Sequence, residues 1–268
     1  FKANGLVVYP TEGEAVRALG LYLTHAELMA DAKARQPRIR PPAQAVAGGS
    51  LLDEADSLAL LARHGVSVVP HRLCRSEDEA VQAFEALGCA MVVVKGCTAD
   101  ASHKSELGLV RLGVRDAASL REAYRAMQAA AAAAKVHLTG VIVAEQIKGQ
   151  RELMIGARVD PVFGPVVLVG DGGKYVEAMP DVQVMLPPFS AEQVVSALRR
   201  LRIAPLMAGV RGEPAWDVAA FCQAAVAVGQ LMLEPQAGIA QLDINPVMVR
   251  AQGQGCAALD AVIYRKEN

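Results

Sequence analysis

The sequence is poor in aromatic residues and has no excess of either charge. Phe, Trp and Tyr account for 4% of its 268 residues, and 27 Lys and Arg balance 28 Asp and Glu. This balance excludes a protein that holds nucleic acid through a basic surface, so we predict no nucleic-acid partner. The apolar content of 53% excludes a wholly disordered chain, and the length is ample for a buried core.

Long hydrophobic runs and paired cysteines are also missing. The most apolar stretch, 218–233, is interrupted by Gln223 and Gln230, and a membrane helix needs roughly 20 apolar residues in a row. The five cysteines are scattered without a C-x-x-C pair, which predicts free thiols rather than disulfides or a zinc site. We therefore predict a cytoplasmic protein with no membrane partner. The chain starts at Phe1 without a signal peptide, so we expect a piece of a longer protein.

Residues 1–46 differ in composition from the rest of the chain. Leu6–Tyr9 is typical of a short strand, and Thr11 is placed to cap a helix over 14–29. The stretch 35–42 is rich in proline and arginine and has no periodicity, as in a linker. We predict that 1–46 is the end of a preceding domain plus a linker, and that the main domain covers 47–268.

Helices and strands alternate through the main domain without a strict strand–helix–strand period. Amphipathic periods, capping residues and glycine stops predict helices over 51–64, 77–87, 117–134, 190–202 and 216–233. Short apolar runs predict strands over 66–69, 90–95, 109–114, 140–147, 152–159, 166–169, 239–249 and 256–264. The fold class that fits this mixture is α+β.

Two segments of the first half are candidates for phosphate chemistry. Lys95 ends a continuous apolar strand, where a buried ammonium group needs an anion. His103 lies beside Lys104 and two serines, and an imidazole can accept and release a phosphoryl group near neutral pH. The alternatives are a lysine that reaches the surface and a solvated loop histidine.

Two further segments come from the middle of the chain. Glu145 ends one predicted strand and Glu152 begins the next, so a turn at Gly149 brings both carboxylates to one edge. The segment Gly170–Gly173 follows an apolar strand, and its backbone N–H groups could approach phosphate oxygens. A charged hairpin end and an ordinary turn are the alternatives.

The strongest geometric pattern lies near the C-terminus. Asp243 and Asn245 alternate along a predicted strand and therefore share one face. A hairpin centred between Gln252 and Gly253 would set Asp260 directly opposite Asn245. Two acids and an amide among apolar residues need a partner, and their hard oxygens suit Mg²⁺.

These motifs occur in a characteristic order, together with 160–165 (DPVFGP) and 209–214 (GVRGEP). Over about 50–265 they resemble the ATP-grasp domain of NDP-forming acyl-CoA synthetases, relatives of succinyl-CoA synthetase and ADP-forming acetate–CoA ligase. The resemblance implies two α+β subdomains that grip a nucleotide, the smaller over about 70–146. It also implies that 1–46 holds the tail of a flavodoxin-like ligase domain.

The resemblance implies that acyl-CoA forms from a carboxylic acid, CoA and ATP, with release of ADP and phosphate through a phosphohistidine relay. ATP or ADP and Mg²⁺ would bind here, whereas CoA would bind mainly to absent upstream domains of the same polypeptide; a homodimer is compatible with this. The implied roles are Lys95 at the phosphates, Glu145 at the adenine hinge, Glu152 at the ribose, Gly170, Gly172 and Gly173 over the phosphates, Asn245, Asp260 and Asp243 at Mg²⁺, His103 as phosphoryl acceptor, and Arg211 as a phosphate contact.

Two departures from the family pattern support an alternative function. The glycine loop carries Asp171 where the family has an apolar residue, and Met185 stands where an arginine is common. Both changes would suit a catalytically degenerate regulatory module, such as the ATP-grasp domain of acetyltransferase fusions. A different ATP-grasp ligase is a third hypothesis, against which His103 argues, because such enzymes need no phosphohistidine.

Overall fold

The chain divides into two compact units, Phe1–Pro41 and Pro42–Asn268. The structure, a computed structural model, describes residues 2–34, 49–101, 104–174, 176 and 178–266. The first unit holds a 3-10 helix (Lys2–Asn4) and α1 (Glu12–Ala34). Thr11 caps α1 as predicted, since its Oγ1 accepts a hydrogen bond from the Glu14 N–H at 3.3 Å.

The strand predicted over Leu6–Tyr9 is wrong. These four residues are exposed and have no strand conformation. A strand needs a neighbour for its backbone N–H and C=O groups, and the described part of this first unit contains no other strand. Their apolar side chains are therefore left exposed on the described part of this unit.

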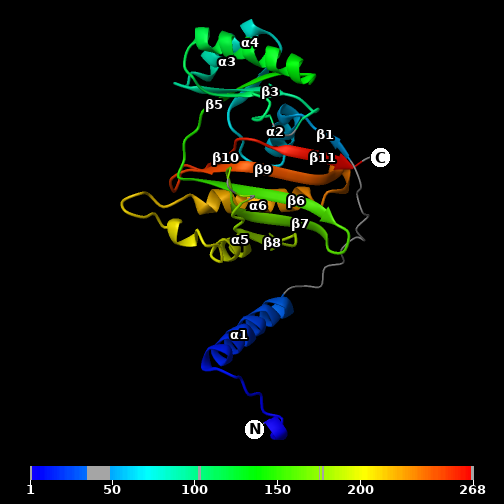
Figure 1. Cartoon of the computed structure of the whole chain (residues 1–268), viewed down its shortest axis with the longest axis vertical. Helices are drawn as coiled ribbons and strands as arrows, with labels where there is room; N and C mark the ends of the chain where they lie inside the picture. Colours follow the sequence, from blue (N-terminus) through cyan, green and yellow to red (C-terminus); the bar gives the residue numbers. More distant parts are fainter. Residues whose placement is uncertain (1, 35–48, 102–103, 175, 177, 267–268) are drawn as a thin grey trace. The chain divides into compact units, whose positions relative to one another are not determined.

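The second unit contains two antiparallel sheets, each covered by helices (Figure 1). The large sheet has the order β1-β11-β9-β6-β7-β8, with β10 paired to β9. Its strands are β1 (Gly49–Leu51), β6 (Arg151–Asp160), β7 (Gly164–Asp171), β8 (Val182–Met185), β9 (Ile239–Val249), β10 (Cys256–Ala258) and β11 (Val262–Lys266). Helices α5 (Ala191–Leu198) and α6 (Val218–Leu231) pack on one face of it, and α2 (Glu54–Arg63) packs beside β11.

The small sheet has the order β2-β5-β3-β4 and forms, with its helices, what we call the small subdomain. Its strands are β2 (His71–Cys74), β3 (Val92–Cys97), β4 (Val110–Val114) and β5 (Gly140–Glu145). Helices α3 (Glu77–Leu87) and α4 (Ala117–Ala134) cover the face turned away from the large sheet (Figure 1). The rest of the second unit is the large subdomain, which also has two 3-10 helices, Ala204–Leu206 and Pro235–Ala237.

Alternation along β9 separates the core from the opposite face of the large sheet. Leu242 and Ile244 are buried against the helices, whereas Asp243 and Asn245 lie on the other face and are only half-buried. In β5 both faces are covered, because Val141 and Val143 pack under α3 and α4 while the alternate residues pack toward the large subdomain. The polar residues of β9 therefore face the side on which the small subdomain lies.

Two strand predictions need correction, and two strands were not predicted. Residues 66–69 form only a single bridge, Val68 to Ala258, and the strand that pairs with β5 is His71–Cys74. The strand predicted over 256–264 is broken at 259–261 into β10 and β11. Strand β1 was not predicted, because it ends where the helix over 51–64 was expected to begin, and that helix in fact begins at Glu54. Strand β8 was not predicted, because Gln183 interrupts its short apolar pattern.

All five cysteines are described and are free thiols, as predicted. Among the described helices, none combines the length and the hydropathy that a membrane crossing requires.

Candidate functional site

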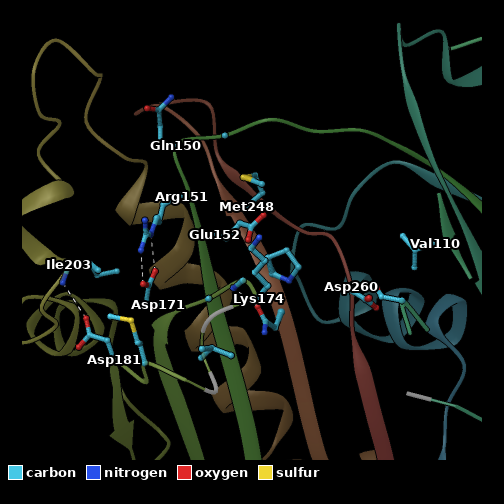
Figure 2. A pocket seen from close by; sticks show the side chains of 18 of the residues that line it. Val110, Gln150, Arg151, Glu152, Asp171, Lys174, Asp181, Ile203, Met248 and Asp260 are labelled. Carbon is cyan, nitrogen blue, oxygen red and sulfur yellow. Dashed lines mark hydrogen bonds and ion pairs between the residues drawn. The ribbon is translucent and has the colours of Figure 1, made fainter. Parts of the chain in front are cut away.

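A cavity of about 1120 Å³ lies between the small subdomain and the polar face of the large sheet (Figure 2). Such a volume accommodates a nucleoside triphosphate. The walls come from β4, from the start of β6, from the turn after β7 and from β9. The predicted site residues among its lining are Glu152, Gly172, Gly173, Asn245 and Asp260. A second cavity of about 850 Å³ adjoins it, shares Asn245 and Asp260, and is lined by Asp243.

The predicted hairpin register is present on both sides of the break in the last strand. Ala258 pairs with Val247 in β10, and Val262 pairs with Asp243 in β11. Continuing this register sets Asp260 level with Asn245. Burial, together with the neighbouring Asp260 charge, raises the pKa of Asp243 above its ordinary range. Burial, followed by the Glu54 charge, likewise raises the pKa of Asp260 against the opposing effect of the Lys95 and Lys104 charges.

The turn after β7 brings backbone N–H groups to the same place. The Gly173 N–H donates to Asn245 Oδ1 at 2.8 Å. Gly173 has a φ of +78°, which favours glycine, and a Cβ there would also displace the flexible Glu152 carboxylate. Gly172 is equally confined, since its Cβ would lie 2.6 Å from the Leu153 carbonyl oxygen.

Three other predicted site residues, Gly170, Glu145 and Arg211, do not line the large cavity. Gly170 is within β7 and pairs with Val182, below the turn. Glu145 ends β5, where its N–H donates to the Pro70 carbonyl. Arg211 is exposed, with a φ of +50°. His103 lies outside the described residues, so its role stays a prediction.

Lys95 is buried as predicted from the strand, but its anion belongs to the protein. Its Nζ lies 2.7 Å from Glu54 Oε1, donates to the Leu259 carbonyl at 2.7 Å, and is 3.9 Å from Asp260 Oδ2. Lys104 Nζ contacts Glu54 Oε2 and lies 3.4 Å from Asp260 Oδ1. Burial alone would raise the pKa of Glu54, but the two lysine charges outweigh it and the pKa lies below its ordinary value.

Asp171 is neutralised within the cavity wall. Arg151 Nε donates to Asp171 Oδ1 at 2.8 Å and Arg151 Nη2 donates to Oδ2 at 2.6 Å, a bidentate pair visible in Figure 2. The pKa of the Arg151 guanidinium is raised by these bonds. Met185 pairs with Val167 and packs against the core of the large subdomain. Asp171 therefore does not present an unpaired carboxylate to the cavity.

The oxygen donors of Asn245, Asp260 and Asp243 fit a magnesium ion that is carried by a nucleotide. Within the described residues, no group of three His, Cys, Asp or Glu side chains is arranged to hold a metal alone. Mg²⁺ usually takes one or two protein carboxylates and keeps waters and phosphates as its other ligands. The raised pKa values of Asp243 and Asp260 indicate carboxylates that a cation would stabilise.

Sequence reasoning missed Glu54 and Arg151. Glu54 has the pattern of an ordinary first-turn acid next to the cap Asp53, and nothing local distinguishes it. Arg151 could have been found, because an antiparallel pairing of β6 with β7 places it diagonally across from the opposite charge of Asp171.

Comparisons with known proteins agree with this geometry. A family model described as an ATP-grasp domain matches residues 44–264. The chain is 32% identical over 261 residues, or 97% of its length, to a trans-feruloyl-CoA synthase from an unknown prokaryotic organism, and it spans 36% of that protein. It is 33% identical over 213 residues, or 78% of its length, to the beta subunit of ADP-forming acetate–CoA ligase I from Pyrococcus furiosus, 90% of which is covered.

A solved structure has the same fold. It is the dinucleotide forming acetyl-coenzyme A synthetase 1 of Ca. Korarchaeum cryptofilum with coenzyme A and Mg-AMPPCP, its phosphohistidine segment pointing towards the nucleotide binding site. The TM-score is 0.70 at 29% identity, over 81% of this chain and 93% of that one. The predicted α+β ATP-grasp fold is confirmed. This chain belongs to the family of ATP-grasp domains found in the ADP-forming acyl-CoA ligases, which include the acetate–CoA ligases.

Proposed function

We propose that this chain is the ATP-binding, phosphoryl-transferring part of an acid–thiol ligase. The complete enzyme would form acyl-CoA from a carboxylic acid, CoA and ATP, and would release ADP and phosphate. The observation that carries the proposal is the convergence on one large cavity of Gly173 from the turn after β7, Asn245 from β9 and Asp260 from the break between β10 and β11. Phosphoryl transfer depends on positioning and charge neutralisation, and this cavity offers amides, carboxylates and lysines for both.

Each wall of the cavity has a proposed task. The Gly172–Gly173 turn would lie over the phosphates, and Lys104 would contact them. Glu152, which lines the cavity beside this turn, would accept hydrogen bonds from the ribose hydroxyls. Asn245 and Asp260 would hold the metal, with Asp243 nearby. When bound, Mg²⁺ supplies charge neutralisation at the phosphate oxygens.

His103 would accept the phosphoryl group from the nucleotide side of the cavity. The adjacent Lys104 lies in the ion-pair cluster at Asp260. CoA and the carboxylic acid would bind elsewhere, either on upstream domains of one polypeptide or on a separate subunit. The isolated chain should therefore bind nucleotide and make little or no acyl-CoA.

The second candidate is a regulatory module that binds a ligand without turnover. Asp171 and Met185 are the features that favour it. The bidentate pairing of Asp171 with Arg151 removes most of that argument, because the carboxylate is already neutralised. We therefore prefer the ligase.

Calorimetric titration with ATP and Mg²⁺ tests the proposed site. The wild-type chain should bind at micromolar to sub-millimolar strength, and Asp260→Ala should weaken binding at least tenfold. Asp78→Ala is the matched control, since Asp78 is an exposed acid paired with Arg121 on the small subdomain, and it should bind like wild type. Absence of nucleotide binding by the wild-type chain would contradict the proposal.

A further inference from the structure

Helix α2 begins at the junction of the two subdomains. It packs on the large-subdomain core through Leu58 and Leu61. Its first turn faces the small subdomain, where Asp53 Oδ2 accepts a hydrogen bond from Thr139 Oγ1 at 2.9 Å. Ala55, on the same turn, packs against the Cys97 cluster of the small sheet. Glu54 lies between them, and its side chain is 1% exposed.

The Glu54 carboxylate binds two cations that both come from the opposite subdomain. Oε1 accepts from Lys95 Nζ at 2.7 Å, and Oε2 accepts from Lys104 Nζ. Lys95 lies within β3, and Lys104 is in the segment between β3 and β4. Each lysine also approaches the Asp260 carboxylate, at 3.9 and 3.4 Å respectively. The four side chains form a charge-balanced cluster at one end of the cavity.

Such a cluster is a costly way to stabilise a fold. Burying Glu54, Lys95 and Lys104 beside the half-buried Asp260 requires desolvation that ion pairing only partly offsets, and an apolar replacement is often as stable. The arrangement does fix two flexible lysine side chains in one place. Without the Glu54 carboxylate, the two ammonium groups would share Asp260 as their remaining counter-charge, at the longer distances, and Lys95 would keep its hydrogen bond to the Leu259 carbonyl.

We propose that Glu54 is a positioning residue for the phosphate end of the nucleotide. It holds the Lys95 and Lys104 ammonium groups beside Asp260, the proposed metal ligand, so that the cations of one subdomain meet the acids of the other. The inference rests on the proposed function, because it assumes that phosphates bind at Asp260. Glu54 itself touches neither the phosphates nor the metal.

The test compares MgATP with adenosine on the wild-type chain and on Glu54→Gln, which preserves shape and removes the charge. MgATP affinity is measured by calorimetry and adenosine affinity by ligand-observed NMR. We expect at least tenfold weaker MgATP binding and adenosine affinity within twofold of wild type. The matched control is Glu77→Gln, since Glu77 also bridges two cations, Arg121 and Arg125, but within the small subdomain. It should bind both ligands normally.

Each other result overturns the inference. Equal loss of MgATP and adenosine binding would mean that Glu54 has only a structural role. Unchanged or tighter MgATP binding would mean that it does not position the lysines. If Glu54→Gln does not fold, Glu54→Asp makes the same comparison, because its shorter side chain keeps the charge but cannot reach both lysines. A wild-type chain that binds no MgATP would overturn the proposed function, and this inference with it.

Discussion

At the scale of single residues, the partner of a charged side chain decides what that side chain does. Asp171 is an acid in the loop proposed to lie over phosphates, and from the sequence it favours a degenerate site. In the structure it is half of a bidentate pair with Arg151, and such pairs are among the strongest charge-assisted hydrogen bonds. The same acid is therefore compatible with a phosphate-binding cavity.

A charge-pair experiment tests this argument. Arg151→Ala leaves the Asp171 carboxylate unpaired in the cavity wall, and MgATP affinity should fall about tenfold, or about 1.4 kcal/mol. Removing Asp171 as well, in Arg151→Ala/Asp171→Leu, should return the affinity to within threefold of wild type. Calorimetry of wild type, Arg151→Ala, Asp171→Leu and the double variant measures the coupling as a double-mutant cycle.

Arg125→Ala is the control for that cycle, because Arg125 pairs with Glu77 on the surface of the small subdomain. Its MgATP affinity should match wild type. A double variant that binds as weakly as Arg151→Ala would show that Arg151 itself, and not the exposed Asp171 charge, matters.

The sequence pattern predicts the polar residues on and opposite β9, but it does not predict the ion pairs between the two subdomains. The alternation of Asp243 and Asn245, and the hairpin register that sets Asp260 opposite, could be read from spacing alone because both are local. Glu54 could not, since it meets Lys95 and Lys104 only after the subdomains pack, across 41 and 50 residues of chain. Its buried environment comes from tertiary structure, which no local period encodes.

At the scale of elements, caps and turns fix where the helices of the large subdomain begin. Asp217 caps α6, accepting from the Ala220 N–H at 3.2 Å, and it also accepts from the Gly255 N–H at 2.8 Å. One carboxylate thus ties the helix start to the hairpin turn between β9 and β10. The amide of Gly255, more than any other group, holds the pKa of Asp217 below its ordinary range.

Asp217→Ala should lower the free energy of unfolding by about 1–2 kcal/mol at pH 7, because two amides lose their acceptor. Asp217→Asn, which keeps one side-chain oxygen, should lose less. A lowered folded-state pKa means that the contribution is present above the ordinary value of 3.8 and is lost as the pH falls through the folded pKa. Urea unfolding at pH 7, 5 and 3 measures the free energy of unfolding of wild type and Asp217→Ala. The difference between the two should shrink only at pH 3.

An Asp217→Ala difference that is the same at all three pH values would contradict the role of the charge. An Asn variant as unstable as the Ala variant would contradict the capping bond itself.

Elements with strong local signals were predicted, and short strands were not. Helices α3 and α4 begin at the predicted caps, because Ser76 and Asp116 accept from the backbone three residues on. Strands β2 and β8 have four residues each and depend on their neighbours for pairing. The segment Leu6–Tyr9 has the composition of a strand but lacks such a neighbour in the described part of its unit.

At the scale of the molecule, the whole proposed site lies in the second unit. Every residue that lines the large cavity is between 104 and 260, beyond the boundary at Pro41. The chain spans 36% of the feruloyl-CoA synthase that it resembles. Our proposal therefore places nucleotide binding and phosphoryl transfer from ATP on this chain, and CoA and acid binding on other domains or subunits.

The central claim is that this chain transfers phosphate and does not merely bind nucleotide. Incubation with Mg²⁺ and γ-labelled ATP tests it most directly. We predict an acid-labile, base-stable label on the wild-type chain and on His137→Ala, a control for an exposed histidine. His103→Ala should bind MgATP with unchanged affinity and take up no label. A wild-type chain that binds MgATP without becoming labelled, or a label that persists in His103→Ala, would contradict the account.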